Sequence, residues 1–250
     1  MLIATLVLAL LIGVALGVLG GGGSILAVPV LVYVAGQDAK AAIAMSLLVV
    51  GVTSAAGAVS HARAGRVRWR TAAIFGAAGM AGAYGGGRLA EFIPGNWLLI
   101  AFALMMGVTA VAMLRGRDDP DPSHADGQVK VGRILVEGLG VGLVTGLVGA
   151  GGGFLIVPAL VLLGGVPMAT AVGTSLVVIA MKSGAGLFGY LASTSIDWTL
   201  ALSVTGAAVV GSVVAGRFAG RVSEDGLRRA FGWFVAVMAV LVLVQELLLR

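Results

Sequence analysis

The 250-residue chain has no cysteine, two histidines and few charges. Charged residues make up 11% of it, against about 25% in a typical soluble domain. The absence of cysteine excludes a disulfide framework, a thiolate metal site and a cysteine nucleophile. Two histidines, His61 and His124, are too few for a histidine-rich metal centre. We therefore expect neither a bound metal nor a cofactor.

Apolar residues, by contrast, make up 59% of the chain. No soluble fold of this length has enough interior to bury that much apolar surface, so the composition predicts a polytopic membrane protein. The net charge of +5 would suggest nucleic acid as the partner of a soluble protein. In a membrane protein, basic residues are first read as topology signals. We expect the lipid bilayer, and no nucleic acid, as a partner.

Long apolar runs separated by short polar stretches predict an all-α fold, because ~20 helical residues cross a bilayer. Two apolar pieces, 24–36 and 154–165, follow glycine clusters and reach only ~20 Å as helices, so the sequence leaves open whether they are re-entrant or short crossing helices. A polar stretch, 115–132, is predicted to be a cytoplasmic linker between a first transmembrane repeat, 1–114, and a second, 133–250. The long helices are expected at 2–19, 41–62, 71–90, 96–114, 134–149, 167–192, 198–216 and 228–249.

The two halves repeat each other at a fixed offset of 129 residues. The segment GVLGGGGSILAVP, 17–29, falls on GLVGAGGGFLIVP, 146–158. Matches of Pro, Trp, Arg and Ser carry the argument, since these residues are rare in so apolar a chain. At the same offset Ser46 meets Ser175, Ser54 meets Ser183, Trp69 meets Trp198 and Arg88 meets Arg217.

Basic residues cluster in three loops that we assign to the cytoplasmic side, where Lys and Arg collect. Twelve of the 16 basic residues lie in 63–70, 115–133 and 217–229. The loop 193–198 has no basic residue and is expected outside, although it is the repeat partner of 63–70. The halves are therefore predicted to be inverted repeats of about five helical segments each.

This topology requires 134–165 to enter and leave the membrane on one side, with the cluster Gly149–Gly153 as the apex of a hairpin. Gly20–Gly23 is then the apex of a hairpin from the opposite face. Helices starting near Ser24 and Phe154 would leave unpaired N–H groups and partial positive charge at both bends, which favours an anion. Close helix packing by small residues is the alternative explanation of the glycines.

Lys182 is predicted to lie ~15 Å of helix from the outer end of 167–192, too deep for its side chain to reach water. Ionisable residues at such depth usually face a cavity or a partner and mark a substrate path. We expect Lys182 to contact the anion, with a buried pair to Glu137 as the alternative. Glu137 is also a candidate proton carrier. Thr53 occupies the equivalent position of the first half.

Hydroxyl groups on the long helices could donate hydrogen bonds to a bound oxyanion. Helix–helix contacts, or bonds to the preceding helical turn, are the alternative roles for these hydroxyls, which include Ser54 and Ser183. No catalytic residue and no metal ligand is predicted. The candidate substrate-binding residues are Gly22, Gly23, Ser24, Ser46, Gly151, Gly152, Gly153, Thr174, Ser175 and Lys182.

The doubled glycine–proline element, VLGGGGSILAVP at 18–29 and GLVGAGGGFLIVP at 146–158, resembles the TauE/SafE sulfite exporter family, also called the TSUP permeases. Ala-Met-Ser-Leu, 44–47, and Gly-Thr-Ser-Leu, 173–176, are similar to that family's TSL element. Met45 departs from the pattern where the second half has Thr174. The resemblance covers nearly the whole chain outside 115–132. It implies transport of sulfur-containing anions such as sulfite, thiosulfate or organosulfonates, outward or inward.

We therefore expect a multi-pass secondary transporter of the bacterial inner membrane that moves a small anion by alternating access. A passive anion channel and a permease for a different small organic anion are the alternatives. An enzyme is not expected, because the chain has no GxSG element, no deeply placed histidine and no Walker A sequence. The sequence leaves open the anion, the direction of transport, the coupling ion and whether the chain forms a homo-oligomer.

Overall fold

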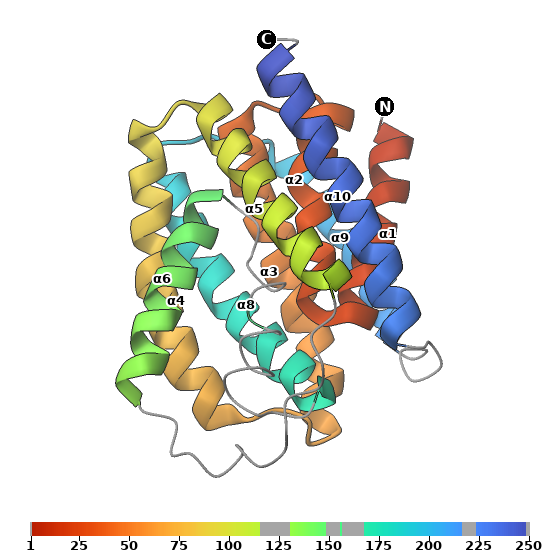
Figure 1. Cartoon of the computed structure of the whole chain (residues 1–250), viewed down its shortest axis with the longest axis vertical. Coiled ribbons are helices and arrows are strands. Elements are labelled where there is room, and N and C mark those ends of the chain that lie inside the picture. The colour runs from red at the N-terminus through yellow and green to blue at the C-terminus, as the bar shows by residue number, and fades with distance from the viewer. Residues whose placement is uncertain (1, 116–130, 149–155, 157–167, 217–223, 249–250) are drawn as a thin grey trace.

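The computed structural model describes residues 2–115, 131–148, 156, 168–216 and 224–248. Within these residues the chain is helical and contains no strand, as expected where backbone polar groups must be satisfied inside each segment. Figure 1 shows the helices as one bundle. The long helices are α1 (Leu2–Leu19), α3 (Ala39–Arg63), α4 (Trp69–Leu89), α5 (Gly95–Arg115), α6 (Val131–Val148), α8 (Met168–Leu191), α9 (Trp198–Gly216) and α10 (Glu224–Leu248).

The predicted all-α fold is confirmed, and the helix ends lie within four residues of their predicted positions. The largest difference is the start of α10, which begins at Glu224 rather than at 228. By length and composition, α3, α8 and α9 each contain a segment suited to crossing a bilayer.

The first apolar stretch folds back on itself. After α1 the chain forms a 3-10 helix (Gly20–Leu26), the short α2 (Ala27–Pro29) and a π-helical turn (Val30–Val34). A Cβ built on Gly23 would lie 2.8 Å from the carbonyl oxygen of Ile12, whereas residues eleven apart in a continuous helix are ~16 Å apart. Leu2 and Gln37 also line one pocket. Residues 24–36 are therefore the return arm of a hairpin that begins and ends at one end of the bundle.

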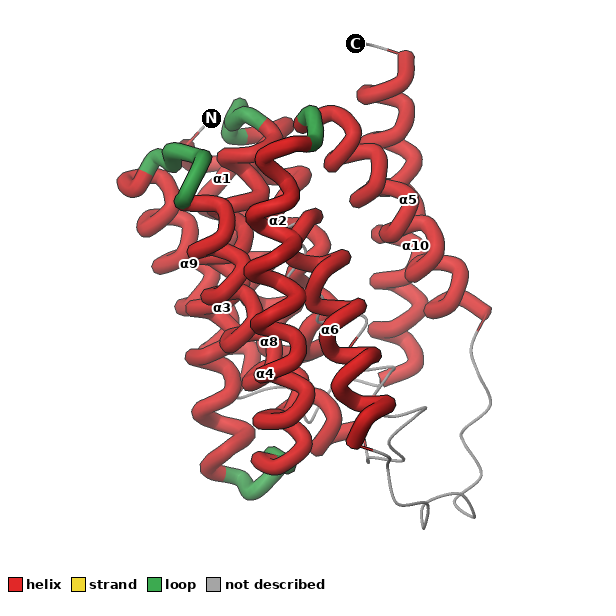
Figure 2. Tube along the Cα trace, turned by 90° about the vertical axis from the view of Figure 1, so that its left-hand side faces the viewer, coloured by secondary structure: helices red, strands yellow, loops and turns green. Residues whose placement is uncertain are grey.

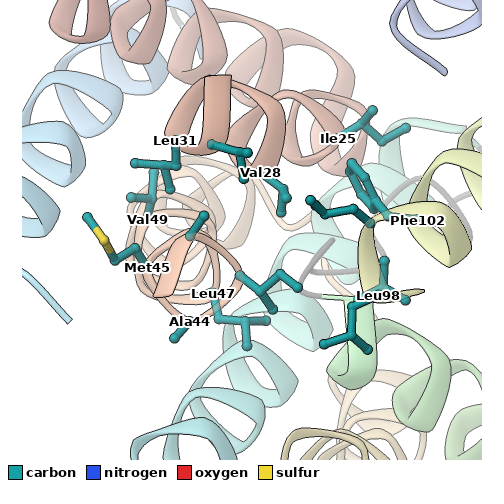
Figure 3. Packing of buried hydrophobic residues seen from close by; sticks show 14 of the residues in the cluster. Ile25, Val28, Leu31, Ala44, Met45, Leu47, Val49, Leu98 and Phe102 are labelled. Atoms are coloured by element: carbon teal, nitrogen blue, oxygen red, sulfur yellow. The ribbon is translucent and has the colours of Figure 1, made fainter. Parts of the chain in front are cut away.

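This return arm is buried inside the protein. Ile25, Val28 and Leu31 belong to one cluster with residues of α3 and α5, each side chain at most 1% exposed. Figure 3 shows them facing Leu47 of α3 and Phe102 of α5. The arm is too short to cross the membrane and too apolar for water, so packing against two long helices accounts for its position.

The loops 35–38 and 64–68 lie at opposite ends of the bundle. Each turns at a glycine with positive φ, Gly36 (φ 68°) and Gly65 (φ 69°), a conformation that side chains disfavour. The N–H of Arg68 donates to Thr174 Oγ1 at 3.0 Å, so α8 begins beside 64–68. The far end of α8 leads to Asp197, which lines the same pocket as Gln37. In Figure 2 three green loops share one end and the fourth lies at the other.

The two halves make the same helix contacts with their roles exchanged. Gly13 of α1 meets the backbone of Ala208 of α9, and Gly142 of α6 meets the backbone of Gly79 of α4. The second pair is the first pair displaced by 129 residues in both partners. Small residues at these positions let the helix backbones approach closely. The same displacement relates Gly17 on Ser212 to Gly146 on Ala83, and Gly211 on Leu10 to Gly82 on Leu139.

Candidate functional site

The centre of the molecule is the crossing of α3 and α8. A Cβ built on Gly51 would lie 3.2 Å from Ser183 Cβ and 3.9 Å from the carbonyl oxygen of Ala180, and residues 51 and 180 are repeat equivalents. The crossing therefore brings the same position of both halves together. We call Thr53, Ser54, Lys182 and Ser183 the central layer; all four side chains are at most 1% exposed.

Lys182 extends from α8 toward α4 and α6. Its Nζ donates a hydrogen bond to Thr145 Oγ1 at 2.9 Å. The Thr145 hydroxyl donates in turn to the carbonyl oxygen of Val141 at 2.7 Å, so its oxygen is an acceptor for the lysine. A Cβ built on Gly79 would lie 3.7 Å from Lys182 Cδ. A glycine on α4 thus makes room for Lys182, and a threonine on α6 accepts its hydrogen bond.

The alternative partner of Lys182, Glu137, lies on α6 eight residues before Thr145, which is ~12 Å along the helix axis. The described hydrogen bond of Lys182 goes to a neutral hydroxyl. Glu137 itself is half-buried. This geometry favours a lysine without a carboxylate partner over the buried ion pair.

Three hydroxyls of the central layer make no hydrogen bond to the described residues: Thr53 Oγ1, Ser54 Oγ and Ser183 Oγ. Leaving a buried polar group unpaired costs about 1–3 kcal/mol, and most such groups in proteins have a partner. Ser54 and Ser183 are repeat equivalents, as are Thr53 and Lys182. The layer therefore presents hydroxyl and amino donors near the point where equivalent positions of the two halves meet.

The other predicted hydroxyls have structural partners. Ser46 Oγ donates to the carbonyl oxygen of Ile43 at 2.7 Å, and Ser175 Oγ donates to that of Val172 at 2.8 Å. A serine hydroxyl has one proton, and both serines use it within their own helix. Thr174 Oγ1 accepts the backbone N–H of Arg68 at the start of α4. These contacts match the alternative role, bonding to the preceding turn or between helices.

The predicted helix start near Ser24 lies four residues too late. After α1 the return arm begins as a 3-10 helix, Gly20–Leu26, which includes Gly22, so the arm starts at Gly20 rather than at Ser24. Glycine permits this course because the backbone at Gly23 packs on α1, with its Cβ position 2.6 Å from Leu16 N. Ser24 is fully buried beside it. The equivalent candidates Gly151, Gly152 and Gly153 lie outside the described residues.

Sequence reasoning missed Thr145 and the buried, unpaired Ser212, which lies beside Gly57. Thr145 is a single threonine in the apolar run of α6, and no pattern marks it. Its role depends on α6 lying next to Lys182, a contact between segments 37 residues apart. Knowledge of the α6–α8 arrangement would have been needed to identify it.

The outer surface completes the description of the class. Large apolar residues are exposed along the outer helices, and Trp69, Trp97, Trp198 and Trp233 each expose at least half of their surface. Trp69, Trp97 and Trp198 lie in the first turns of their helices, where membrane proteins place tryptophan at the lipid–water interface. Over the described residues, an all-helical bundle with an apolar exterior and a buried polar layer is characteristic of an integral membrane protein.

The sequence model of the Sulfite exporter TauE/SafE family matches residues 5–242. The chain belongs to this family, whose members are membrane transporters, and the expected family is confirmed.

Curated relatives agree. A probable membrane transporter protein of Xylella fastidiosa strain 9a5c is 37% identical over 243 residues, covering 93% of this chain and 91% of the relative. The probable membrane transporter protein YdhB of Bacillus subtilis is 25% identical over 239 residues, covering 93% and 96%. One from Methanocaldococcus jannaschii is 28% identical over 198 residues, covering 75% and 73%. No solved structure matches the chain significantly.

Proposed function

We propose that the chain is a secondary transporter of the bacterial inner membrane that carries a small sulfur-containing anion, such as sulfite, thiosulfate or an organosulfonate. The observation that carries this proposal is the central layer: Lys182 is 1% exposed and bonded to a neutral hydroxyl, and three further hydroxyls are buried with no partner among the described residues. Donors without acceptors suit a ligand rich in anionic oxygens. The family to which the chain belongs is named for sulfite export.

Alternating access is supported by the exchanged contacts of the two halves. In a transporter with inverted repeats, the two halves can exchange conformations. This exchange opens a fixed site near the midplane first toward one side of the membrane and then toward the other. The pairs Gly13–Ala208 and Gly142–Gly79 are one such interface occurring twice. Loop 64–68 and its repeat partner, 193–197, lie at opposite ends of the bundle, as Figure 1 shows in orange and cyan.

The orientation follows from the charges. Loop 64–68 is flanked by or contains Arg63, Arg66, Arg68 and Arg70, whereas the repeat-equivalent loop has no arginine. The end of the bundle that carries 64–68 is therefore assigned to the cytoplasm.

Small residues on facing backbones, rather than large side chains, separate the helices at the exchanged contacts, which lets them slide with little repacking.

The test is transport by the purified chain in liposomes loaded with unlabelled anion. Labelled sulfite, thiosulfate and methanesulfonate should enter saturably and accelerate when the same anion is present inside, because a carrier returns faster when loaded. A passive channel would give flux without this counterflow. Absence of flux for all three anions, while an unrelated neutral solute enters through the protein, would overturn the anion proposal.

A further inference from the structure

We propose that Lys182 carries a proton across the membrane with each anion, so that the protein is an anion–proton symporter. This inference rests on the proposed function and names its co-substrate. Its starting point is a buried amino group whose hydrogen-bond acceptor is a neutral hydroxyl, Thr145 Oγ1, at 2.9 Å.

Among the residues that the structure describes, Lys182 Nζ has no carboxylate partner. α8 packs against α3, α4, α6 and the stretch Gly20–Leu26. In the described parts of these elements and of α8 the one carboxylate is that of Glu137, and Gly20–Leu26 has no ionisable residue. Residues 149–167, of which the structure describes only Ile156, include no ionisable residue. The ionisable residues of these elements are Lys40, His61 and Arg63 on α3, Arg70, Tyr84 and Arg88 on α4, Arg133 and Glu137 on α6, and Tyr190 on α8.

Lys182 Nζ lies at the level of Thr145, whereas Glu137 precedes Gly138, whose carbonyl oxygen lies 3.6 Å from the Cβ position of Gly79. Glu137 lies two helical turns below Thr145, ~12 Å away along α6. Tyr84 is half-exposed, and the hydroxyl of Tyr190 donates to the carbonyl oxygen of Leu147. An ammonium at Lys182 would therefore be a buried charge without a counterion, which costs several kcal/mol.

A bound anion supplies the missing countercharge. Binding of the anion and protonation of Lys182 therefore favour each other. In the empty carrier Lys182 is a neutral amine that donates to Thr145. On the loading side a proton from water forms an N–H bond with the lone pair of Nζ, and the anion pairs with the resulting ammonium. The two cross together; on the other side the anion leaves and the proton returns to water. Net movement is one anion and one proton, with the amine regenerated.

The first half explains why we infer one proton rather than two. Thr53 stands where the second half has Lys182, and Leu16 stands where it has Thr145. Neither can exchange a proton at physiological pH. The central layer as described therefore holds one group that can carry a proton per transport cycle.

The deciding experiment measures proton and anion entry together in liposomes that contain a trapped pH dye. Methanesulfonate is the probe, because it is the anion of a strong acid and carries no proton itself at neutral pH. The wild-type protein should acidify the interior with one proton per methanesulfonate, and this uptake should be insensitive to membrane potential. Thiosulfate, a dianion, should enter with one proton and move one net negative charge.

Lys182→Arg sharpens the test, since a guanidinium stays protonated in proteins. This variant should keep exchange of labelled for unlabelled methanesulfonate and lose net uptake by at least tenfold, because the empty carrier cannot return uncharged. Lys40→Arg, at a surface lysine whose Nζ donates to the carbonyl oxygen of Glu91, is the matched control and should keep both. The wild-type stoichiometry decides the question even where Lys182→Arg does not fold.

Two results would overturn the inference in distinguishable ways. Methanesulfonate uptake without acidification, or uptake driven by membrane potential with one net charge per anion, would refute the symport while leaving anion transport intact. Absence of flux for methanesulfonate, thiosulfate and sulfite alike would refute both the symport and the proposed function.

Discussion

The equivalent regions around Lys182 and Thr53 have the same backbone packing and different chemistry. Around Lys182, Gly79 of α4 and Thr145 of α6 border the side chain, and the threonine accepts its hydrogen bond. Around Thr53 the repeat-equivalent positions are Ala208 of α9 and Leu16 of α1, both fully buried. The glycine contacts that set the distances between helices are duplicated, while the charged donor occurs once. This difference indicates that the repeated framework serves movement and that the non-repeated side chains define the ligand.

The largest expected effect comes from removing the one charged group of the comparison. Lys182→Met should weaken anion transport by about 10- to 100-fold, since hydrogen bonds to charged groups contribute about 1.5–3 kcal/mol. Methionine has a side chain of similar length to lysine and no amino group to bury. The variant should therefore fold and be at least as stable as the wild type. Initial rates in liposomes at low anion concentration measure the effect. Wild-type rates with Lys182→Met would remove this lysine from the site.

The duplicated contacts can be broken one half at a time. Gly142→Ala on α6 and Gly13→Ala on α1 would each place a methyl group against the facing backbone, of Gly79 and Ala208 respectively. Overpacking of this kind costs typically 1–3 kcal/mol, and we expect both variants to lose stability by similar amounts. Thermal unfolding in detergent measures this loss.

Two nearby glycines serve as controls for these variants. A Cβ on Gly140 of α6 or on Gly206 of α9 meets no atom within 4 Å among the described residues. Alanine there should leave the unfolding temperature unchanged or raise it slightly, because alanine is the better helix former. Equal losses at Gly140 and Gly142 would show that helix packing is not what the glycine at 142 provides.

A smaller effect is expected from the hydroxyl that distinguishes the two centres. Thr145→Val removes the acceptor of Lys182 Nζ, and a typical hydrogen bond contributes about 0.5–1.5 kcal/mol, so the apparent affinity for the anion should change about 2- to 10-fold. Thr205→Val is the control, since that hydroxyl donates within its own helix, to the carbonyl oxygen of Ala201. An anion affinity that responds equally to both variants would argue against a special role of Thr145.

The smallest effect concerns Thr174, a predicted substrate-binding residue whose hydroxyl oxygen accepts a hydrogen bond at the start of α4. Thr174→Val removes the acceptor of the Arg68 N–H, and loss of such a contact at a helix start costs about 1 kcal/mol. We expect lower thermal stability with unchanged anion affinity, measured by unfolding and by transport at several anion concentrations. A loss of affinity without loss of stability would return Thr174 to the binding site.

The long helices were predictable because each is an uninterrupted apolar run bounded by loop residues, as at Trp198–Gly216, which the sequence located to the residue. The course of the glycine-rich bend, Gly20–Leu26, was harder to predict. The residue at which the return arm begins after a glycine run depends on packing, here of Gly23 on α1. The depth of Lys182 followed from its distance to the helix end, but its partner did not.

The hydroxyls show most plainly where sequence reasoning ends. Ser46 and Ser54 lie on one helix, eight residues apart, and both are fully buried. The first donates to its own helix and the second has no partner in the described residues. The difference lies in side-chain rotation and neighbours, which leave no trace in the sequence.

The most direct test of the account is the sidedness of the two repeat-equivalent loops. The chain has no cysteine, so Ala64→Cys and Ser193→Cys, both at exposed equivalent positions, can be introduced singly and treated with a membrane-impermeant thiol reagent on intact cells and on inverted vesicles. We predict labelling of Ser193→Cys in cells and of Ala64→Cys in inverted vesicles. Labelling of both variants from the same side would contradict the inverted arrangement of the two halves.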